Sequence, residues 1–238
     1  MDKKQQTEVP KQRQITLDMH IHTFYSIDSE NKPEDIFSKA REAGINVLGV
    51  CDHDTVEGAK NMKKLSPSDI TVLLGQEVRT EDGEVLVYGV NETLQKKIGL
   101  VETCKMAKEK NGFIIVPHPF DKMRDGIGNK LEDILNYIDV IEVFNAHCLF
   151  NKYNNKAKDF AEKHNIPMIA GSDSHSTAEI GAVKNIMTLY SNIEINEKNI
   201  FSAIKSGNIT ITETRNTGIK KHIRVGLVKL KKNLKKKF

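Results

Sequence analysis

The sequence predicts an α/β protein whose strands form either a parallel barrel or a doubly wound sheet. From Ile15 onward, short apolar runs alternate with longer stretches of helical spacing, the pattern expected of βαβ units. The glycine-rich dinucleotide-binding motif and the P-loop motif are both absent from the sequence, which argues against a nucleotide-binding sheet. Because barrels carry their functional residues on the loops that follow the strands, the residues after each strand decide between the two architectures.

Eight segments are predicted to be strands because each is short, apolar and bounded by polar residues. These predicted strands are Ile15–Met19, Asn46–Cys51, Thr71–Leu74, Val85–Val90, Phe113–Pro117, Val140–Phe144, Pro167–Ala170 and Ile186–Tyr190. The predicted helices are Pro33–Ala43, Val56–Leu65, Leu94–Lys110, Lys130–Tyr137, Lys152–His164 and Glu197–Lys205. Pro33 marks a helix start, and Gly44, Gly112 and Gly207 follow helix ends.

Length and composition fit one globular domain. The 238 residues are 38% hydrophobic and 29% charged. Apolar runs such as Phe113–Val116 are far shorter than the roughly 18 residues that cross a bilayer. The first residues lack an apolar signal segment, and three cysteines are too few for a disulfide scaffold, so we expect a cytoplasmic protein. We expect a flexible leader over 1–14, a barrel over 15–217 and a basic tail over 218–238.

The predicted tail differs from the rest of the chain most clearly in its charge. Nine Lys or Arg and no acidic residue follow Gly218, which leaves 27 basic against 32 acidic residues in the rest of the chain. Its apolar residues recur every three or four positions, which predicts a basic amphipathic helix. Such a helix could contact nucleic acid, an anionic membrane surface or a partner, or pack its apolar stripe on the acidic barrel. The sequence does not decide among these four roles.

Histidine and carboxylate residues gather where the predicted strands end. His20 and His22 lie two apart at the end of the first strand, so both imidazoles can point the same way, as in a metal site. Six of the eight histidines follow an apolar strand in this manner. They are His20, His22, His53, His118, His147 and His175. His164 closes a helix and His222 lies in the tail, and neither is predicted to act.

This set exceeds the four to six ligands that one ion takes, so two or three divalent metals with a bridging carboxylate are implied. Clustered metals generate hydroxide near neutral pH and offset charge on a phosphoryl group. Hydrolysis of a phosphate ester is therefore the preferred reaction. Hydrolysis of an amide or carboxylic ester by a metal pair would use similar ligands and stays open at this point.

Five motifs in order make the chain resemble the PHP family, named for polymerase and histidinol phosphatase. They are His-x-His-Thr followed by Ser-x-Asp at 20–28, Cys-Asp-His-Asp-Thr at 51–55, Gly-Gln-Glu at 75–77, Val-Pro-His-Pro at 116–119 and Gly-Ser-Asp-Ser-His at 171–175. The resemblance spans residues 17 to about 181. It implies a distorted (β/α)7 TIM-like barrel, here with a basic C-terminal helical tail, a trinuclear Zn, Mn or Fe centre, and phosphoesterase activity.

The resemblance also implies the ligand set. It assigns the first metal to His20, His22, Glu77 and Asp173, the second to Glu77 and His118 with one further residue, and the third to Asp28, His53 and His175. The attacking hydroxide would be held among the metals bound by Glu77 and Asp173. Some members of the family have histidine where Asp28 stands, so an oxygen ligand here favours Mn or Fe over Zn.

The last ligand of the second metal is expected shortly after Ile-Glu-Val-x-Asn, where the chain offers Asn145, His147 and Cys148. We prefer His147, since imidazole near a carboxylate is the commoner ligand. Asp18 and Asp52 precede ligand histidines and are expected either to orient an imidazole from behind or to cap a strand end.

Arg124, in the loop after His118, is a candidate clamp for a substrate phosphate, and Arg79 is a second one. The predicted function is hydrolysis of a phosphomonoester, such as histidinol phosphate or a nucleotide, or of a short oligonucleotide. The competing hypothesis is a nucleic-acid or partner-binding module with a structural metal site and a basic tail. Intact ligands at every motif favour the enzyme. The sequence does not indicate an oligomeric state.

Overall fold

A single curved sheet of nine strands organises the computed structural model, which describes residues 10–217. The strands are β1 (Gln12–Ile21), β2 (Val47–His53), β3 (Thr71–Arg79), β4 (Glu84–Tyr88), β5 (Phe113–Val116), β6 (Val140–Asn145), β7 (Met168–Gly171), β8 (Val183–Tyr190) and β9 (Thr210–Thr214). Their order in the sheet is β7-β6-β5-β4-β3-β2-β1-β8-β9. All eight predicted strands are confirmed, and β9 is additional.

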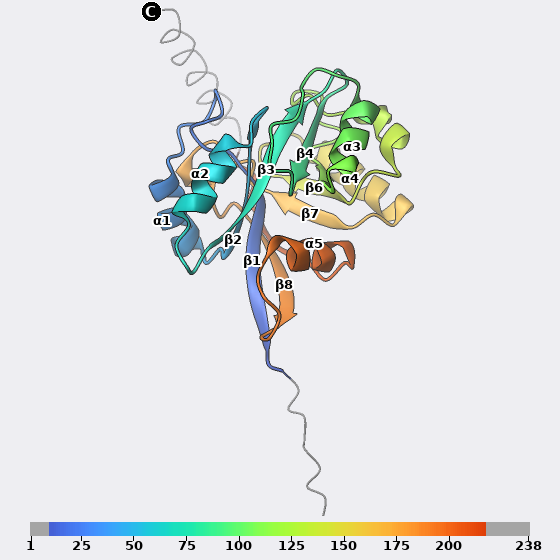
Figure 1. Ribbon diagram of the computed structural model, residues 1–238. Coiled ribbons are helices and arrows are strands. Elements are labelled where there is room, and N and C mark those ends of the chain that lie inside the picture. The colour runs from blue at the N-terminus through green and yellow to red at the C-terminus, as the bar shows by residue number, and fades with distance from the viewer. Residues whose placement is uncertain (1–9, 218–238) are drawn as a thin grey trace, which may run out of the picture.

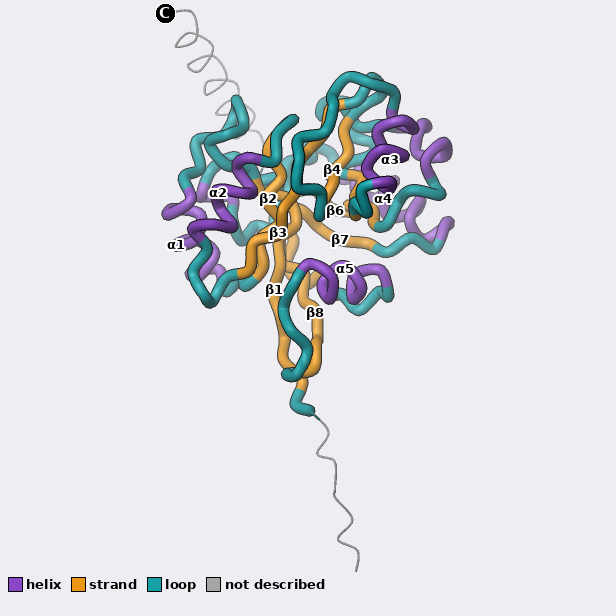
Figure 2. The backbone as a smooth tube through the Cα atoms, in the orientation of Figure 1, coloured by secondary structure: helices purple, strands orange, loops and turns teal. Residues whose placement is uncertain are grey.

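The helices lie mainly on the outside of this sheet. They are α1 (Pro33–Ala43), α2 (Glu57–Leu65), α3 (Leu100–Glu109), α4 (Asn151–His164) and α5 (Glu197–Lys205), with the short 3-10 helices η1 (Gly128–Ile134) and η2 (Thr177–Glu179). Figure 1 shows α1 and α2 on one side of the molecule, α3 and α4 on the other, and α5 beside β1 and β8. The same separation of helices around the strands is visible in Figure 2.

The sheet nearly closes into a barrel between β7 and β1, in keeping with the predicted barrel. Beyond β7, Ser174 donates its N–H to the carbonyl of His20 at 3.2 Å, and its carbonyl accepts the N–H of His22 at 2.9 Å. Deeper in this seam the side chain of Asn185 on β8 donates to the carbonyls of Leu17 at 3.1 Å and Ala170 at 2.9 Å. A buried amide thereby supplies the hydrogen bonds that a continuous ladder would have made.

The sheet is mixed, whereas βαβ repetition predicts parallel strands throughout. β4 is antiparallel to both β3 and β5, because a short turn in which Thr80 donates to the carbonyl of Gly83 at 2.7 Å joins β3 to β4. A parallel pair would need a crossover of a dozen or more residues. β8 is likewise antiparallel to β1 and β9.

Other boundaries also differ from the prediction. β1 begins at Gln12, inside the predicted leader, and residues 1–9 lie outside the described part of the chain. α3 begins at Leu100 rather than Leu94, since Lys97 has a positive φ of 57°. The predicted helix Lys130–Tyr137 is the 3-10 helix η1, in which Leu131 and Ile134 are buried at a spacing of three. The predicted basic tail over 218–238 also lies outside the described residues.

Alternate residues of the strands fill the barrel interior. Leu17, Leu73 and Ile115 belong to one buried cluster, to which α5 contributes Ile200 and Ile204. Separate clusters fix α1 and α2 against β1–β3, and α3 and α4 against β4–β6. The three cysteines are buried and free. Within residues 10–217 no helix combines the length and apolar character that a bilayer crossing requires.

Replacing Gly75 by alanine should destabilise the barrel. A Cβ there would lie 2.3 Å from Cε1 of Tyr88 and 2.8 Å from the carbonyl oxygen of Val50, and the Tyr88 hydroxyl is fixed by its hydrogen bond to the Met19 carbonyl. We expect a loss of about 1–3 kcal/mol in the free energy of unfolding by urea. Gly99→Ala is the matched control, because no atom lies within 4 Å of its Cβ. Equal stability of the two variants would contradict this account.

Candidate metal centre

The histidines and carboxylates singled out above meet at one edge of the barrel, where the parallel strands end. β1 supplies His20 and leads into His22, β2 ends at His53, and β3 carries Glu77. His118 follows β5, His147 follows β6, and Asp173 and His175 follow β7. Asp28 lies between β1 and α1. All nine are buried except His53, which is partly exposed.

Local backbone strain directs three of the strand ends. Asp54, His118 and Asp173 have positive φ values of 54°, 30° and 53°, which non-glycine residues seldom adopt. Each costs about 1–3 kcal/mol, and such residues cluster at functional sites because the strain aims a side chain. His118 and Asp173 use it to turn towards the centre of the cluster.

Four side chains form the innermost group. Nε2 of His22 lies 3.3 Å from Oε2 of Glu77 and 3.4 Å from Oδ1 of Asp173. Nε2 of His20 lies 3.6 Å from an oxygen of each carboxylate. Ligands bound at about 2.1 Å to one tetrahedral ion would be about 3.4 Å apart, so these separations fit a shared cation.

The hydrogen bonding of these atoms supports the same conclusion. Nε2 of His20, Nε2 of His22, Oε2 of Glu77 and Oδ1 of Asp173 are buried and make no hydrogen bond. Buried polar atoms are normally hydrogen-bonded, so atoms left without a partner and facing one another need a ligand. Burial, followed by the neighbouring His175, lowers the pKa of His22 to about 3. Its imidazole is therefore neutral at pH 7, the form that binds metals.

A second group lies next to the first. Oδ2 of Asp28 is 3.5 Å from Nε2 of His53, and Oδ1 is 3.4 Å from Nε2 of His175. The His22 ring stacks on His175 with centroids 4.2 Å apart. Burial opposes ionisation of Asp28, but the charge and hydrogen bonds of His175 and His53 hold its pKa below the ordinary value. This carboxylate and two imidazoles suit a further divalent ion.

Glu77 stands between all these groups. Oε2 also approaches Nδ1 of His53 at 3.1 Å, and Oε1 approaches Nε2 of His118 at 3.3 Å. Burial alone would raise the pKa of Glu77, but His53 and His20 hold it well below the ordinary value. A carboxylate whose two oxygens face different imidazoles can bridge two cations.

The two histidines predicted to share the second metal site lie in different groups of possible ligands. His118 is grouped with His20 and Asp173, whereas His147 is grouped with Asp173 and His175. The His147 ring stacks on His175 with centroids 5.3 Å apart. His147 therefore adjoins His175, a residue of the third predicted site.

Asn145 and Cys148 are the other two candidates for the second site. The Asn145 amide donates to the Asp173 carboxylate, so it supplies a hydrogen and not a lone pair to the cluster. Burial and the neighbouring Asp121 raise the pKa of the Cys148 thiol, which disfavours the thiolate that would bind a metal.

Arg124 lies inside the cluster. One of its guanidinium nitrogens, Nη2, pairs with Oδ2 of Asp173, and its side chain is 13% exposed. Arg79 differs, because its side chain is 42% exposed and its guanidinium pairs with the Asp54 carboxylate, with Nε at 2.7 Å from Oδ2. Of the two predicted phosphate clamps, Arg124 therefore faces the metal ligands directly.

Asp18 and Asp52 support the site through backbone and hydroxyl groups. Asp18 accepts the N–H groups of His20 and Ser172, each at 3.2 Å, so it caps the strand seam. Asp52 accepts the Ser26 hydroxyl at 2.7 Å, and that hydroxyl oxygen lies 3.1 Å from Nδ1 of His22. Asp52 thus contacts a ligand imidazole through one intervening serine.

Glu142 is a site residue that strand-end reasoning missed. Its Oε1 lies 2.9 Å from Nδ1 of His20, which turns Nε2 of that ring towards Glu77 and Asp173. Its Oε2 accepts the His118 N–H at 2.9 Å. Gly171 leaves the space, because a Cβ there would lie 1.7 Å from Oε1. A glutamate inside the apolar run Val140–Phe144 was the signal, since buried glutamate is rare unless paired.

Glu84 was missed for a different reason. It begins the antiparallel strand β4, so it reaches the same edge from the opposite chain direction. Its Oε1 lies 3.5 Å from Nδ1 of His53. Burial and the neighbouring Glu77 raise its pKa to about 7.

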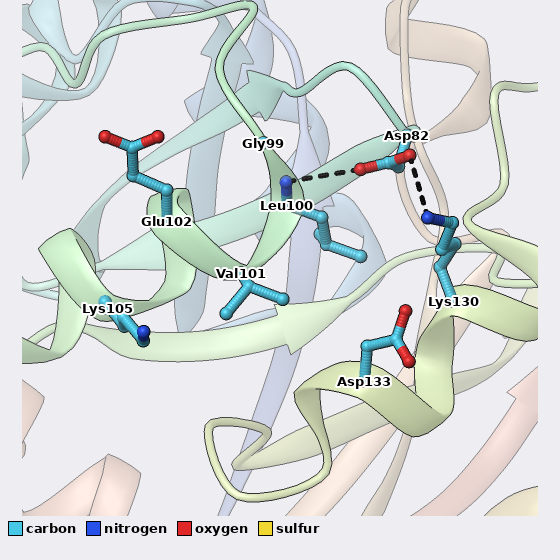
Figure 3. Close-up of a pocket in the computed structure, with 8 residues that line it drawn as sticks. All are labelled: Asp82, Gly99, Leu100, Val101, Glu102, Lys105, Lys130 and Asp133. Carbon is cyan, nitrogen blue, oxygen red and sulfur yellow. Dashed lines mark hydrogen bonds and ion pairs between the residues drawn. The ribbon is translucent and has the colours of Figure 1, made fainter.

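Two surface pockets lie near the turn between β3 and β4. One, of about 530 Å³, is lined by Arg79, Lys97, Lys122 and Glu84 among others, so it adjoins the metal ligands at Glu84. The other, of about 470 Å³, lies at the start of α3 and is shown in Figure 3. There Asp82 accepts the Leu100 N–H at 3.4 Å and pairs with Lys130 at 3.5 Å, so its carboxylate is already used as a helix cap.

Part of the sequence is similar to that of known proteins. Residues 151–209 match the family model described as PHP-associated. The uncharacterized protein MJ1587 of Methanocaldococcus jannaschii is 34% identical over 154 residues, which cover 60% of this chain and 89% of that protein.

Two solved structures share the fold. One is a two-domain protein of Bacteroides vulgatus containing a predicted PHP-like metal-dependent phosphoesterase, with a TM-score of 0.71, 16% identity, and coverage of 85% of this chain and 66% of that one. The other is Endonuclease Q in complex with a 27-mer duplex with an abasic lesion, with a TM-score of 0.56, 18% identity, and coverage of 84% and 58%. This chain spans less than two thirds of each. The chain therefore matches a PHP-associated family model in its C-terminal part and shares its fold with a predicted PHP-like metal-dependent phosphoesterase and with Endonuclease Q.

Proposed function

We propose that this protein hydrolyses phosphate esters with two or three divalent ions, Mn, Zn or Fe, held by the ligand cluster. One observation carries the proposal: Nε2 of His20, Nε2 of His22, Oε2 of Glu77 and Oδ1 of Asp173 are buried and make no hydrogen bond. Nε2 of His22 lies 3.3 Å from that oxygen of Glu77 and 3.4 Å from that of Asp173, and Nε2 of His20 lies 3.6 Å from that of Asp173. Divalent ions bound there lower the pKa of coordinated water and offset charge on a phosphoryl group.

The residues of the chain itself then have distinct tasks. Glu142 orients His20, and Asp52 orients His22 through Ser26. Glu77 and Asp173 hold the ions and supply the negative charge that keeps them in place. Arg124 presents Nη1, which is buried and makes no hydrogen bond, as a donor for a phosphoryl oxygen.

The substrate we favour is a nucleotide or a short oligonucleotide. Phe24 and Tyr25 directly follow the His22-Thr23 segment, are 42% and 43% exposed, and have ring centroids 4.7 Å apart. Exposed aromatic faces stack on nucleobases at about 1–3 kcal/mol per base. The Endonuclease Q structure, which holds a DNA duplex, supports the same class of substrate.

Hydrolysis of a generic aryl phosphate with added Mn²⁺ tests the proposal. We expect activity in the unaltered protein and its loss, by about 1,000-fold, in His20→Ala. His164→Ala is the matched control, because His164 lies at the end of α4 beside Phe160 and Glu132. An inactive unaltered protein, or an active His20→Ala variant, would instead favour a binding module with a structural metal site.

A substrate screen follows from the same assay. Nucleoside monophosphates, short RNA and short DNA are expected to be hydrolysed faster than histidinol phosphate, because only the nucleotides and nucleic acids offer a nucleobase to Phe24 and Tyr25. Preference for histidinol phosphate would contradict the aromatic contact.

A further inference from the structure

Arg124 lies in the position that the family resemblance gives to a second metal ion. The imidazole of His118 faces three carboxylates there: its Nε2 lies 3.3 Å from Glu77, 4.0 Å from Asp173 and 4.0 Å from Glu84. The charges of Asp173, Glu77 and Glu84 act on the Arg124 guanidinium and, against the effect of burial, raise its pKa. Its charge is thus permanent.

The two carboxylate oxygens of Asp173 have different surroundings. Its Oδ2 takes the Nη2 group of Arg124 and the Nδ2 group of Asn145, the latter at 3.0 Å. Its Oδ1 makes no hydrogen bond and faces His20 and His22. One oxygen is therefore ready for a metal, while the other already has two donors.

The remaining ligand expected of a second metal faces a different carboxylate. Nε2 of His147 lies 3.5 Å from Oε2 of Glu179, and the His147 ring stacks on His175. The side chains around His118 therefore meet a guanidinium cation where the expected set would hold a metal ion.

We propose that the Arg124 guanidinium replaces the second metal ion, so that the centre holds two divalent ions and one fixed organic cation. One ion belongs to His20, His22, Glu77 and Asp173, and the other to Asp28, His53 and His175. The inference rests on the proposed function in assuming that these groups bind divalent ions. Arg124 contributes charge that would otherwise come from a metal, and its buried Nη1 remains available to the substrate phosphate.

Metal counting tests this arrangement without any measurement of activity. The full chain is loaded with Mn²⁺, freed of unbound metal by gel filtration, and analysed for metal per chain by mass spectrometry. We expect about two Mn²⁺ in the unaltered protein and about three in Arg124→Ala, because removal of the guanidinium frees Glu77, Glu84, Asp173 and His118 for a cation. Arg124→Lys keeps a positive charge and is expected to bind about two.

Arg41→Ala is the matched control, since Arg41 also pairs with a carboxylate, in this case through two nitrogens to Asp69 at 2.7 and 2.8 Å, but on the surface. It should bind about two Mn²⁺. Arg124→Met, which keeps the apolar stem, replaces Arg124→Ala if circular dichroism shows that the alanine variant is unfolded. Three Mn²⁺ in the unaltered protein, or two in the folded variants that lack the cation, would overturn the inference.

Anomalous scattering from Mn²⁺-loaded crystals gives an independent readout. Peaks are expected beside His20 and beside Asp28, and a peak between His118 and Glu84 in the unaltered protein would overturn the inference. These outcomes are separate from those of the proposed function. A protein with three ions that hydrolyses phosphate esters refutes only the role of Arg124, whereas one with two ions and no hydrolysis refutes only the activity.

Discussion

Glu77→Gln is expected to reduce Mn²⁺-dependent phosphoester hydrolysis by about 1,000-fold or more, with little change in fold. Glu77 faces four imidazoles, those of His20, His22, His53 and His118. Glutamine has the same size but no charge, and its amide nitrogen would turn a donor towards the metals. Both groups of ligands would therefore lose affinity together. Steady-state kinetics and metal content measured on the same sample check the result.

The control for this substitution is Glu42→Gln. Glu42 lies on α1 and pairs only with Lys39 among the contacts that the structure gives it, and its side chain is 61% exposed. It should leave rate and metal content unchanged. Retention of both metal content and rate in Glu77→Gln would show that Glu77 does not bridge the ions.

Removal of the metals is expected to lower the melting temperature strongly. An ion that binds only the folded state at 1,000 times its dissociation constant contributes about 4 kcal/mol. For a protein of this size that corresponds to roughly 8–16 °C per occupied site. Without ions, the buried carboxylates Glu77, Glu84 and Asp173 share one small space. Scanning calorimetry of the Mn²⁺-loaded and chelator-treated protein measures the difference.

Glu77→Gln again gives a comparison, because its melting temperature should depend much less on added Mn²⁺. A loaded protein that melts at the same temperature after chelation would mean that the imidazoles and Arg124 alone neutralise the buried carboxylates. In that case the ligand cluster would be a structural polar network rather than a metal centre.

The sequence was sufficient to predict that these strands exist, but it was not sufficient to predict the residues at which they end. β3 continues from Leu74 through Gly75, Gln76 and Glu77 to Arg79, where a criterion based on apolar runs stops too early. Polar residues can extend a buried strand here because they bind one another across the site. β9, with the sequence Thr-Ile-Thr-Glu-Thr, was missed because an edge strand needs no apolar run.

The direction of a strand could not be predicted from sequence periodicity either. Alternation of polar and apolar residues is the same for parallel and antiparallel pairs, and only the length of a connection distinguishes them. The short turn after Arg79 was a readable sign that β4 reverses, and it would have brought Glu84 to the site. The prediction of parallel strands throughout was therefore wrong at a point with chemical consequences.

The residues of the candidate site could likewise be predicted only in part. Residues that follow parallel strands, such as His53 and Asp173, could be gathered from the sequence because strand ends share one edge. The orientation of a long side chain from a loop could not. Arg124 became a neighbour of Asp173 through the path of residues 117–127, which no periodic pattern describes.

The seam between β1 and β7 determines when the ligand cluster can form during synthesis of the chain. Asp18 and Ser172 are 154 positions apart, yet their hydrogen bond and the neighbouring pair of His20 and Ser174 close the barrel around the ligands. A growing chain on the ribosome has His20 and His22 long before it has Asp173 and His175. Contacts so distant along the chain form late and slow folding. The centre therefore becomes complete only after most of the chain has been synthesised, and ions bound earlier would meet only a part of their ligand set.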